Sequence, residues 1–129
     1  MSKERNFLPL NIAVLTVSDT RTEANDTSGK TLVDKLTAAG HHAADKAIVP
    51  DNIYAIRARI SAWIADPDIQ AVVTTGGTGV TGRDGTPEAV EVLLDKKIAG
   101  FGEIFRMLSY DEIQTSTVQS RALAGVANG

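Results

Sequence analysis

The chain has 129 residues, 43% of them hydrophobic, which is enough for one compact domain with its own core. Its formal net charge of −3 provides no basic field for a polyanion such as DNA, and the lack of cysteine excludes disulfides and thiolate metal sites. The first residues, MSKERNFLPLN, lack the apolar core of a signal peptide, and no later run approaches about 18 apolar residues. We therefore expect a cytoplasmic protein that binds neither nucleic acid nor a membrane.

The first half of the chain predicts two strands around one helix. Residues 11–17, NIAVLTV, form a β-branched apolar run typical of a strand buried on both faces of a parallel sheet. A helix is expected over residues 30–39, where apolar side chains share one face, and Gly40 takes the position after its C-cap. Residues 41–49, HHAADKAIV, predict a more exposed second strand, on which we place His41 and His42 in solvent.

The second half continues the same alternation. Isoleucines and Trp63 recur at helical spacing over residues 53–65, after Asp51 or Asn52 as N-cap, and we place Trp63 in the core. Residues 69–75 predict the third strand, a third helix begins at Thr86-Pro87 and runs through residue 94, and residues 102–113 and 119–127 look helical. This order predicts an α/β fold with three αβα layers, a mostly parallel sheet and a single domain over residues 1–129.

Two glycine motifs resemble nucleotide-binding loops without meeting their requirements. Gly77-x-Gly79-x-x-Gly82 has the dinucleotide spacing, but the next helix is expected only at Thr86, whereas a dinucleotide fold places the third glycine in the first helical turn. SGKT, residues 28–31, matches the end of a phosphate loop but lies too far from the preceding strand. We interpret it as a polar loop in which Thr27 or Ser28 caps the following helix.

Polar residues gather where the three predicted strands end, which is the edge where open parallel sheets bind ligands. The glycine loop after the third strand can offer backbone N–H groups to an anion, but the aspartates nearby would repel it by about 3 kcal/mol per pair at an effective dielectric near 20. Mg²⁺, which accepts one or two carboxylates together with substrate phosphates, resolves this conflict. The sequence therefore predicts a polyphosphate nucleotide with Mg²⁺, held by the glycine loop, Asp51 and Asp84.

Each of these residues also has a purely structural alternative. Asp51 could cap the second helix, and Asp84 could form an ordinary turn with Gly85. The glycines could serve backbone geometry alone, and Glu103 with Arg106 has the spacing of a surface pair.

Five segments in order carry a family resemblance: TVSDTRTEANDTSG, IVPDN, TTGGTGVTGRDGTPEA, GFGEIFR and TSTVQSR. Together they resemble the family of molybdenum cofactor biosynthesis protein B and molybdopterin adenylyltransferase, and the protein B (MoaB-like) branch is the more similar. The resemblance implies a molybdopterin-binding-like fold and Mg²⁺-dependent transfer of the adenylyl group of ATP to molybdopterin. It also implies a homo-oligomer, a trimer or a hexamer.

By the same resemblance, the family's two essential aspartates, which hold Mg²⁺, correspond to Asp51 and Asp84. Its nucleotide and pterin contacts correspond to Ser18, Asp26, Ser28, Thr75, Gly76, Gly77, Thr78, Gly79, Glu103, Arg106, Ser120 and Arg121. Family members continue into a further strand, a Pro-Gly loop and closing helices, so we expect this chain to be incomplete at its C-terminus. The main alternative to an enzyme is a catalytically silent molybdopterin-binding or assembly subunit. A general phosphate-binding module is a distant third.

Overall fold

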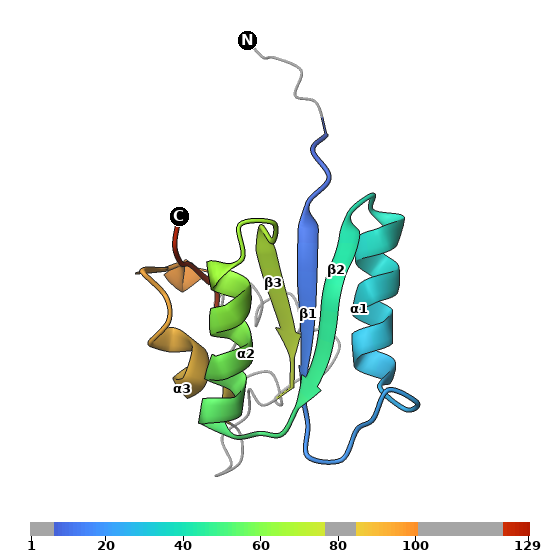
Figure 1. Cartoon of the computed structure of the whole chain (residues 1–129), viewed down its shortest axis with the longest axis horizontal. Helices are drawn as coiled ribbons and strands as arrows, with labels where there is room; N and C mark the ends of the chain where they lie inside the picture. The colour runs from blue at the N-terminus through green and yellow to red at the C-terminus, as the bar shows by residue number, and fades with distance from the viewer. Residues whose placement is uncertain (1–6, 77–84, 101–122) are drawn as a thin grey trace.

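A three-stranded parallel sheet forms the centre of the molecule. The computed structural model describes residues 7–76, 85–100 and 123–129. Strand β1 (Asn11–Val17) lies between β2 (His42–Val49) and β3 (Ala71–Thr75), and both neighbours run parallel to it (Figure 1). Residues 12–17 of β1 are all buried, because this strand is central and both of its faces are covered. The predicted α/β fold with a parallel sheet is confirmed.

Helices cover both faces of this sheet. Leu15 and its same-face neighbours in β1 pack in one core cluster with Ile56, Ile60 and Trp63 of helix α2 (Ile53–Ala65). Thr16 points to the opposite face, where its hydroxyl donates to Asp26 at the start of helix α1 (Thr27–Ala38). Because neighbouring strand residues alternate between faces, α1 and α2 lie on opposite sides of the sheet. The predicted three-layer arrangement is therefore confirmed.

The helix boundaries agree with the sequence pattern except at the two ends of α1, which ends one residue before the predicted residue 39, and at the end of α3. Helix α1 begins at Thr27, three residues earlier than expected, and Gly40 follows it with φ +96°, as predicted for this position. Helix α2 matches its predicted range. Helix α3 (Thr86–Glu91) ends before residue 94, because Leu93 and Leu94 donate their N–H groups to carbonyls three residues back, in tighter turns.

A small second sheet joins two late segments. Strands β4 (Lys96–Lys97) and β5 (Gly125–Val126) pair antiparallel. The helix predicted over residues 119–127 is thus wrong at residues 125 and 126, which form a strand. A Cβ atom at Gly125 would crowd the Lys96 carbonyl oxygen, so the pairing depends on this glycine. The helix predicted over residues 102–113 lies outside the described residues.

His41 differs from its predicted environment, whereas His42 does not. His42 is exposed as predicted, but His41 is half-buried, and its Nδ1 accepts the Leu10 N–H group at 3.0 Å. The interpretation of His41 as solvated is therefore wrong, since its side chain bonds the backbone of Leu10, just before β1.

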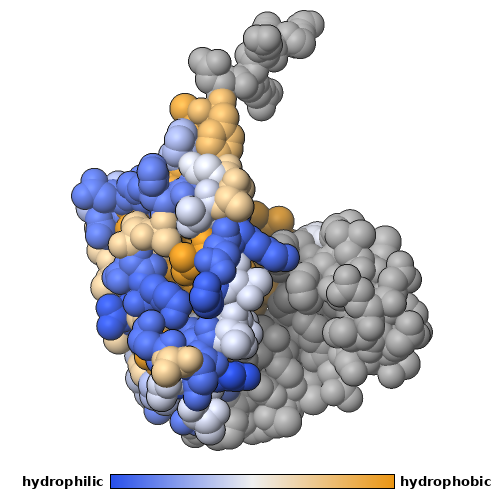
Figure 2. All heavy atoms as spheres, turned by 90° about the vertical axis from the view of Figure 1, so that its right-hand side faces the viewer, coloured by the Kyte–Doolittle hydropathy of each residue, from blue (hydrophilic) through white to orange (hydrophobic). Residues whose placement is uncertain are grey.

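Figure 2 shows a mainly hydrophilic surface on the side where α1 lies. Among the described residues, no helix has the length and apolar character needed to cross a membrane.

Candidate functional site

The carboxyl ends of the three parallel strands bring three of the predicted site segments to one edge of the sheet. Ser18 follows β1, Asp51 lies shortly after β2, and Gly76 follows β3 directly. The Ser18 N–H group donates to the Val49 carbonyl at 2.9 Å, which holds the first two of these segments side by side. The predicted convergence of the loops at this edge is confirmed.

Gly76, the first glycine of the third loop, is required by backbone geometry. Its φ is +99°, and a Cβ atom there would collide with the carbonyl oxygen of Val17 at the end of β1. Its own carbonyl accepts the Thr86 hydroxyl at 2.9 Å, so the start of the loop is bonded to the start of α3. Helix α3 begins four residues after Gly82, as predicted, and this late start excludes a dinucleotide-binding turn.

Asp51 joins the loop after β2 to the start of α3. Its side chain is half-buried, and Oδ1 accepts the Gly85 N–H group at 3.0 Å. Its own N–H group donates to Oδ1 of Asp19 at 3.1 Å. The cap of α2 is Asn52, whose side chain accepts the N–H groups of Tyr54 at 2.9 Å and Ala55 at 3.1 Å. The capping alternative for Asp51 is therefore wrong.

The described part of this edge contains one of the two carboxylates that the sequence predicts for Mg²⁺. Among the described residues, no three His, Cys, Asp or Glu side chains are grouped so that they could hold a metal ion. Zinc sites need three or four such ligands, whereas Mg²⁺ in phosphate-transfer sites takes one or two carboxylates and completes its shell with phosphates and water. Asp51 is one such carboxylate, and its role as a Mg²⁺ ligand stays a prediction. Its predicted partner Asp84 lies outside the described residues.

Asp26, for which a nucleotide contact stays a prediction, is a buried anchor for helix α1. It is the N-cap of the helix, and its Oδ1 accepts the Gly29 N–H group at 2.9 Å. Its Oδ2 accepts the Thr16 hydroxyl at 2.8 Å and the Lys46 ammonium at 3.0 Å. Asp26 is only 4% exposed, and a Cβ atom at Gly29 would collide with its carboxylate. The proposed capping role of Thr27 or Ser28 is wrong, because Asp26 performs it.

Asp26 and Lys46 stabilise each other's charge. Burial alone would raise the pKa of the Asp26 carboxyl, but hydrogen bonds from Gly29, Lys46 and Thr16 outweigh it and hold that pKa below its ordinary value. Burial alone would lower the pKa of Lys46, but the bond to Asp26 and the charges of Asp26 and Glu23 raise it above its ordinary value. Both groups are therefore ionised near neutral pH.

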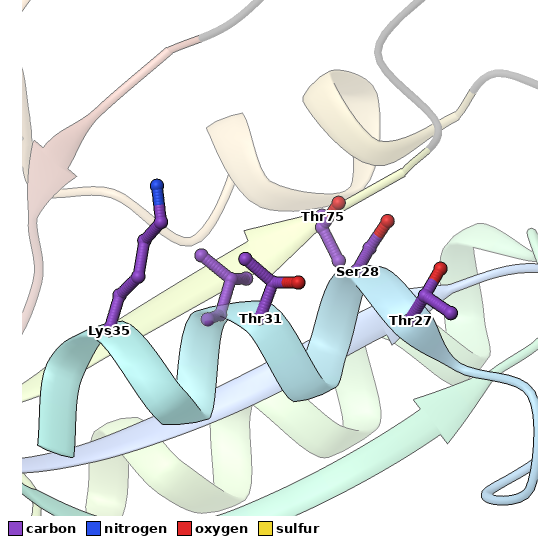
Figure 3. A pocket seen from close by; sticks show the side chains of 6 residues that line it. Thr27, Ser28, Thr31, Lys35 and Thr75 are labelled. Atoms are coloured by element: carbon purple, nitrogen blue, oxygen red, sulfur yellow. The ribbon is translucent and has the colours of Figure 1, made fainter.

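Ser28 and Thr75, two other predicted ligand residues, line the same shallow hollow. Its volume is about 320 Å³, and it lies between the first turns of α1 and the end of β3 (Figure 3). The hydroxyl groups of Ser28 and Thr75 are directed to the same side in this view. The hollow is lined by Thr27, Ser28, Thr31, Leu32, Lys35 and Thr75. SGKT thus forms helical turns that begin well after β1 ends, and it is not a phosphate loop.

Nine predicted site residues remain. The structure describes one of them, Ser18, and the other eight lie outside the described residues. The Ser18 hydroxyl oxygen accepts the N–H groups of Thr20 at 3.2 Å and Arg21 at 3.1 Å, so it shapes the turn that follows β1. The residues outside the described ranges are Gly77, Thr78, Gly79, Asp84, Glu103, Arg106, Ser120 and Arg121.

Three contacts at this edge involve residues absent from the predicted site. Asp19 accepts from the backbone of Asp51, Thr86 donates to Gly76, and Lys46 contacts Asp26. Lys46 follows Asp45 in the strand predicted to be more exposed, so the sequence gives no signal of its contact with Asp26. The contacts of Asp19 and Thr86 depend on how the loops fold back, which no local pattern reveals.

Comparison with known proteins relates this geometry to a family. Residues 13–128 match the family described as a probable molybdopterin binding domain. Molybdenum cofactor biosynthesis protein B of Escherichia coli K12 is 61% identical over 122 residues, which cover 95% of this chain and 72% of that protein. This chain belongs to the molybdenum cofactor biosynthesis protein B family. The protein B of Bacillus subtilis 168 is 49% identical over 114 residues, covering 88% of this chain and 67% of that protein.

Solved structures of protein B relatives share the fold. A crystal structure of molybdenum cofactor biosynthesis protein B has a TM-score of 0.90 at 44% identity, covering 95% of this chain and 77% of that one. The tungsten cofactor synthesizing protein MoaB from Pyrococcus furiosus has a TM-score of 0.77 at 38% identity, covering 94% of this chain and 75% of that one. The molybdopterin-binding-like fold expected from the sequence is therefore confirmed.

Proposed function

We propose that this protein B family member binds molybdopterin and adenylylates it with Mg²⁺-ATP. In this reaction an oxygen of the terminal phosphate of molybdopterin attacks the α-phosphorus of ATP and forms a new P–O bond. The bond from that phosphorus to the oxygen bridging to the β-phosphate breaks, and pyrophosphate leaves with the electron pair. Family membership supports the pathway, and the observation that carries the catalytic proposal is the placement of Asp51.

Asp51 has the properties that a metal-positioning carboxylate needs. It stands at the carboxyl edge of the sheet, the usual ligand-binding edge of such folds. Because Asn52 caps α2, the helix does not require a carboxylate at position 51. The Gly85 N–H group holds only Oδ1 at 3.0 Å, which fixes the orientation of the carboxylate at the start of α3. We infer that the charge of Asp51 serves the ligand and not the local fold.

The other predicted site residues at this edge would bind and orient the two anionic substrates. Ser28 and Thr75 line one hollow and can donate hydroxyl hydrogen bonds to phosphate oxygens without adding charge. Bound Mg²⁺ would neutralise the charge that builds up on the phosphates during transfer. Asp51 and Asp84 would hold it, and the backbone amides of residues 76–79 would bind an anionic group beside it.

The proposal is tested by incubating the full-length protein with molybdopterin, ATP and Mg²⁺ and measuring adenylylated pterin and pyrophosphate. Asp51→Asn keeps an oxygen that can accept the Gly85 N–H group but removes the charge. We expect its turnover to fall by on the order of 10²-fold or more, with normal pterin binding and melting temperature. Asp68→Asn is the matched control, since Asp68 is exposed in the loop before β3, at the opposite edge of the sheet.

The outcomes separate the enzyme from its alternative. Pterin binding without adenylylated product in the wild-type protein would identify a silent molybdopterin-binding or assembly subunit. Full turnover by Asp51→Asn would remove this carboxylate from the mechanism. Loss of turnover by Asp68→Asn as well would show that the effect reflects general charge and not the site.

A further inference from the structure

Lys46, a residue of strand β2, contacts two carboxylates in the connection between β1 and α1. Its Nζ lies 3.0 Å from Oδ2 of Asp26 and 3.5 Å from Oε2 of Glu23. The Asp26 side chain is 1% exposed, that of Lys46 is 22% exposed and that of Glu23 is 75% exposed. Lys46 therefore links a buried anchor to the solvent-facing part of the connection.

The connection it holds is a hydrogen-bonded unit. The Arg21 guanidinium donates to the Asn25 carbonyl at 2.7 Å, and the Thr22 N–H group donates to Asn25 Oδ1 at 2.7 Å. The Ser18 hydroxyl oxygen closes the first turn by accepting from Arg21 at 3.1 Å. Because these bonds make the connection stiff, the contacts of Lys46 with residues 23 and 26 orient all of it relative to the sheet.

The buried end of this arrangement also sets the position of Ser28. Asp26 receives hydrogen bonds from β1, β2 and the first turn of α1, through Thr16, Lys46 and Gly29. Ser28 stands in that first turn and lines the hollow that it shares with Thr75. Without Lys46, the buried carboxylate would lose its counter-charge close to where the phosphates of the proposed substrate would bind.

We propose that Lys46 is a positioning residue that holds the 18–26 connection and the Ser28 end of α1 in place to receive the phosphates of the nucleotide. This inference rests on the proposed function, because that function supplies the nucleotide. Lys46 acts through Asp26 and Glu23, and its removal should therefore weaken nucleotide binding more than it slows the chemical step.

The experiment compares full-length wild type with Lys46→Met, Lys46→Arg and Lys30→Met, by amide hydrogen exchange and by kinetics with ATP. Lys46→Met should speed exchange by about 10-fold or more over residues 19–29, with amides of α2 little changed. It should raise KM for ATP by about 5-fold or more, with kcat within about 2-fold of wild type. Lys46→Arg should restore most of both, and Lys30→Met, which removes an exposed ion pair on α1, should match wild type.

Glu23→Gln keeps the test decisive if Lys46→Met does not fold. It removes only the exposed carboxylate, so we expect faster exchange over residues 19–25 and a smaller rise in KM, with the melting temperature unchanged. An unchanged KM, or exchange that is faster throughout the protein, would show that Lys46 only stabilises the fold and would overturn the inference. If wild type forms no adenylylated pterin, the proposed function fails, and the exchange measurement alone still decides whether Lys46 positions the connection.

Discussion

Replacing Gly76 by alanine tests whether the first glycine of the third loop serves backbone geometry. A non-glycine residue at positive φ costs about 1–2 kcal/mol, and φ here is +99°. The new Cβ would also collide with the carbonyl oxygen of Val17. That oxygen belongs to the backbone of a buried strand and cannot swing away as a flexible side chain would, so overpacking adds about 1–3 kcal/mol. We expect Gly76→Ala to lower the free energy of unfolding by about 2–5 kcal/mol.

Urea unfolding followed by tryptophan fluorescence measures this effect, because Trp63 is the single tryptophan and is 4% exposed. At about 4 °C per kcal/mol for a domain of this size, the melting temperature should fall by about 8–20 °C. Gly100→Ala is the control, since no described atom outside its chain neighbours and its own helix lies within 4 Å of the added Cβ. Its effect should be below about 1 kcal/mol. If Gly76→Ala were as stable as Gly100→Ala but bound ATP poorly, the geometric explanation would be wrong and the glycine would serve the ligand.

Three further outcomes are expected. Folding lowers the pKa of Asp26 from its ordinary value of 3.8. The stability that the charged carboxylate contributes is therefore complete above pH 3.8 and is lost as the pH falls through the lowered pKa. Acid titration should destabilise wild type more steeply than Asp26→Asn. Asn52→Ala should cost about 1–2 kcal/mol in thermal unfolding, because two N–H groups of α2 lose their acceptor, whereas Asn52→Asp should cost little. Light scattering should show a trimer or a hexamer of the full-length protein, and a monodisperse monomer at micromolar concentration would contradict this.

The sequence predicts the location of a residue best where that residue closely follows a strand. Asp51 could be chosen because strand order alone determines which loops meet, but its bond to Gly85 and the capping role of Asn52 required coordinates. Asp26 shows the opposite case. Its sequence context suggests a ligand contact, yet it is buried among Thr16 of β1, Lys46 of β2 and Gly29 in the first turn of its own helix. Short polar side chains fit caps, turns and ligand sites equally well, so burial has to decide among these roles.

The sequence by itself determined the alternation of strands and helices, the parallel sheet and the edge where ligands should bind, because these depend on local periodicity and on the short reach of each connection. Only the tertiary structure decided that residues 125 and 126 pair with β4 as a strand, that His41 holds the incoming chain and that Lys46 joins the first connection to the sheet. Each of these depends on a partner far away in the sequence, and that partner supplies the hydrogen bond or the charge that selects one conformation among several that are locally acceptable.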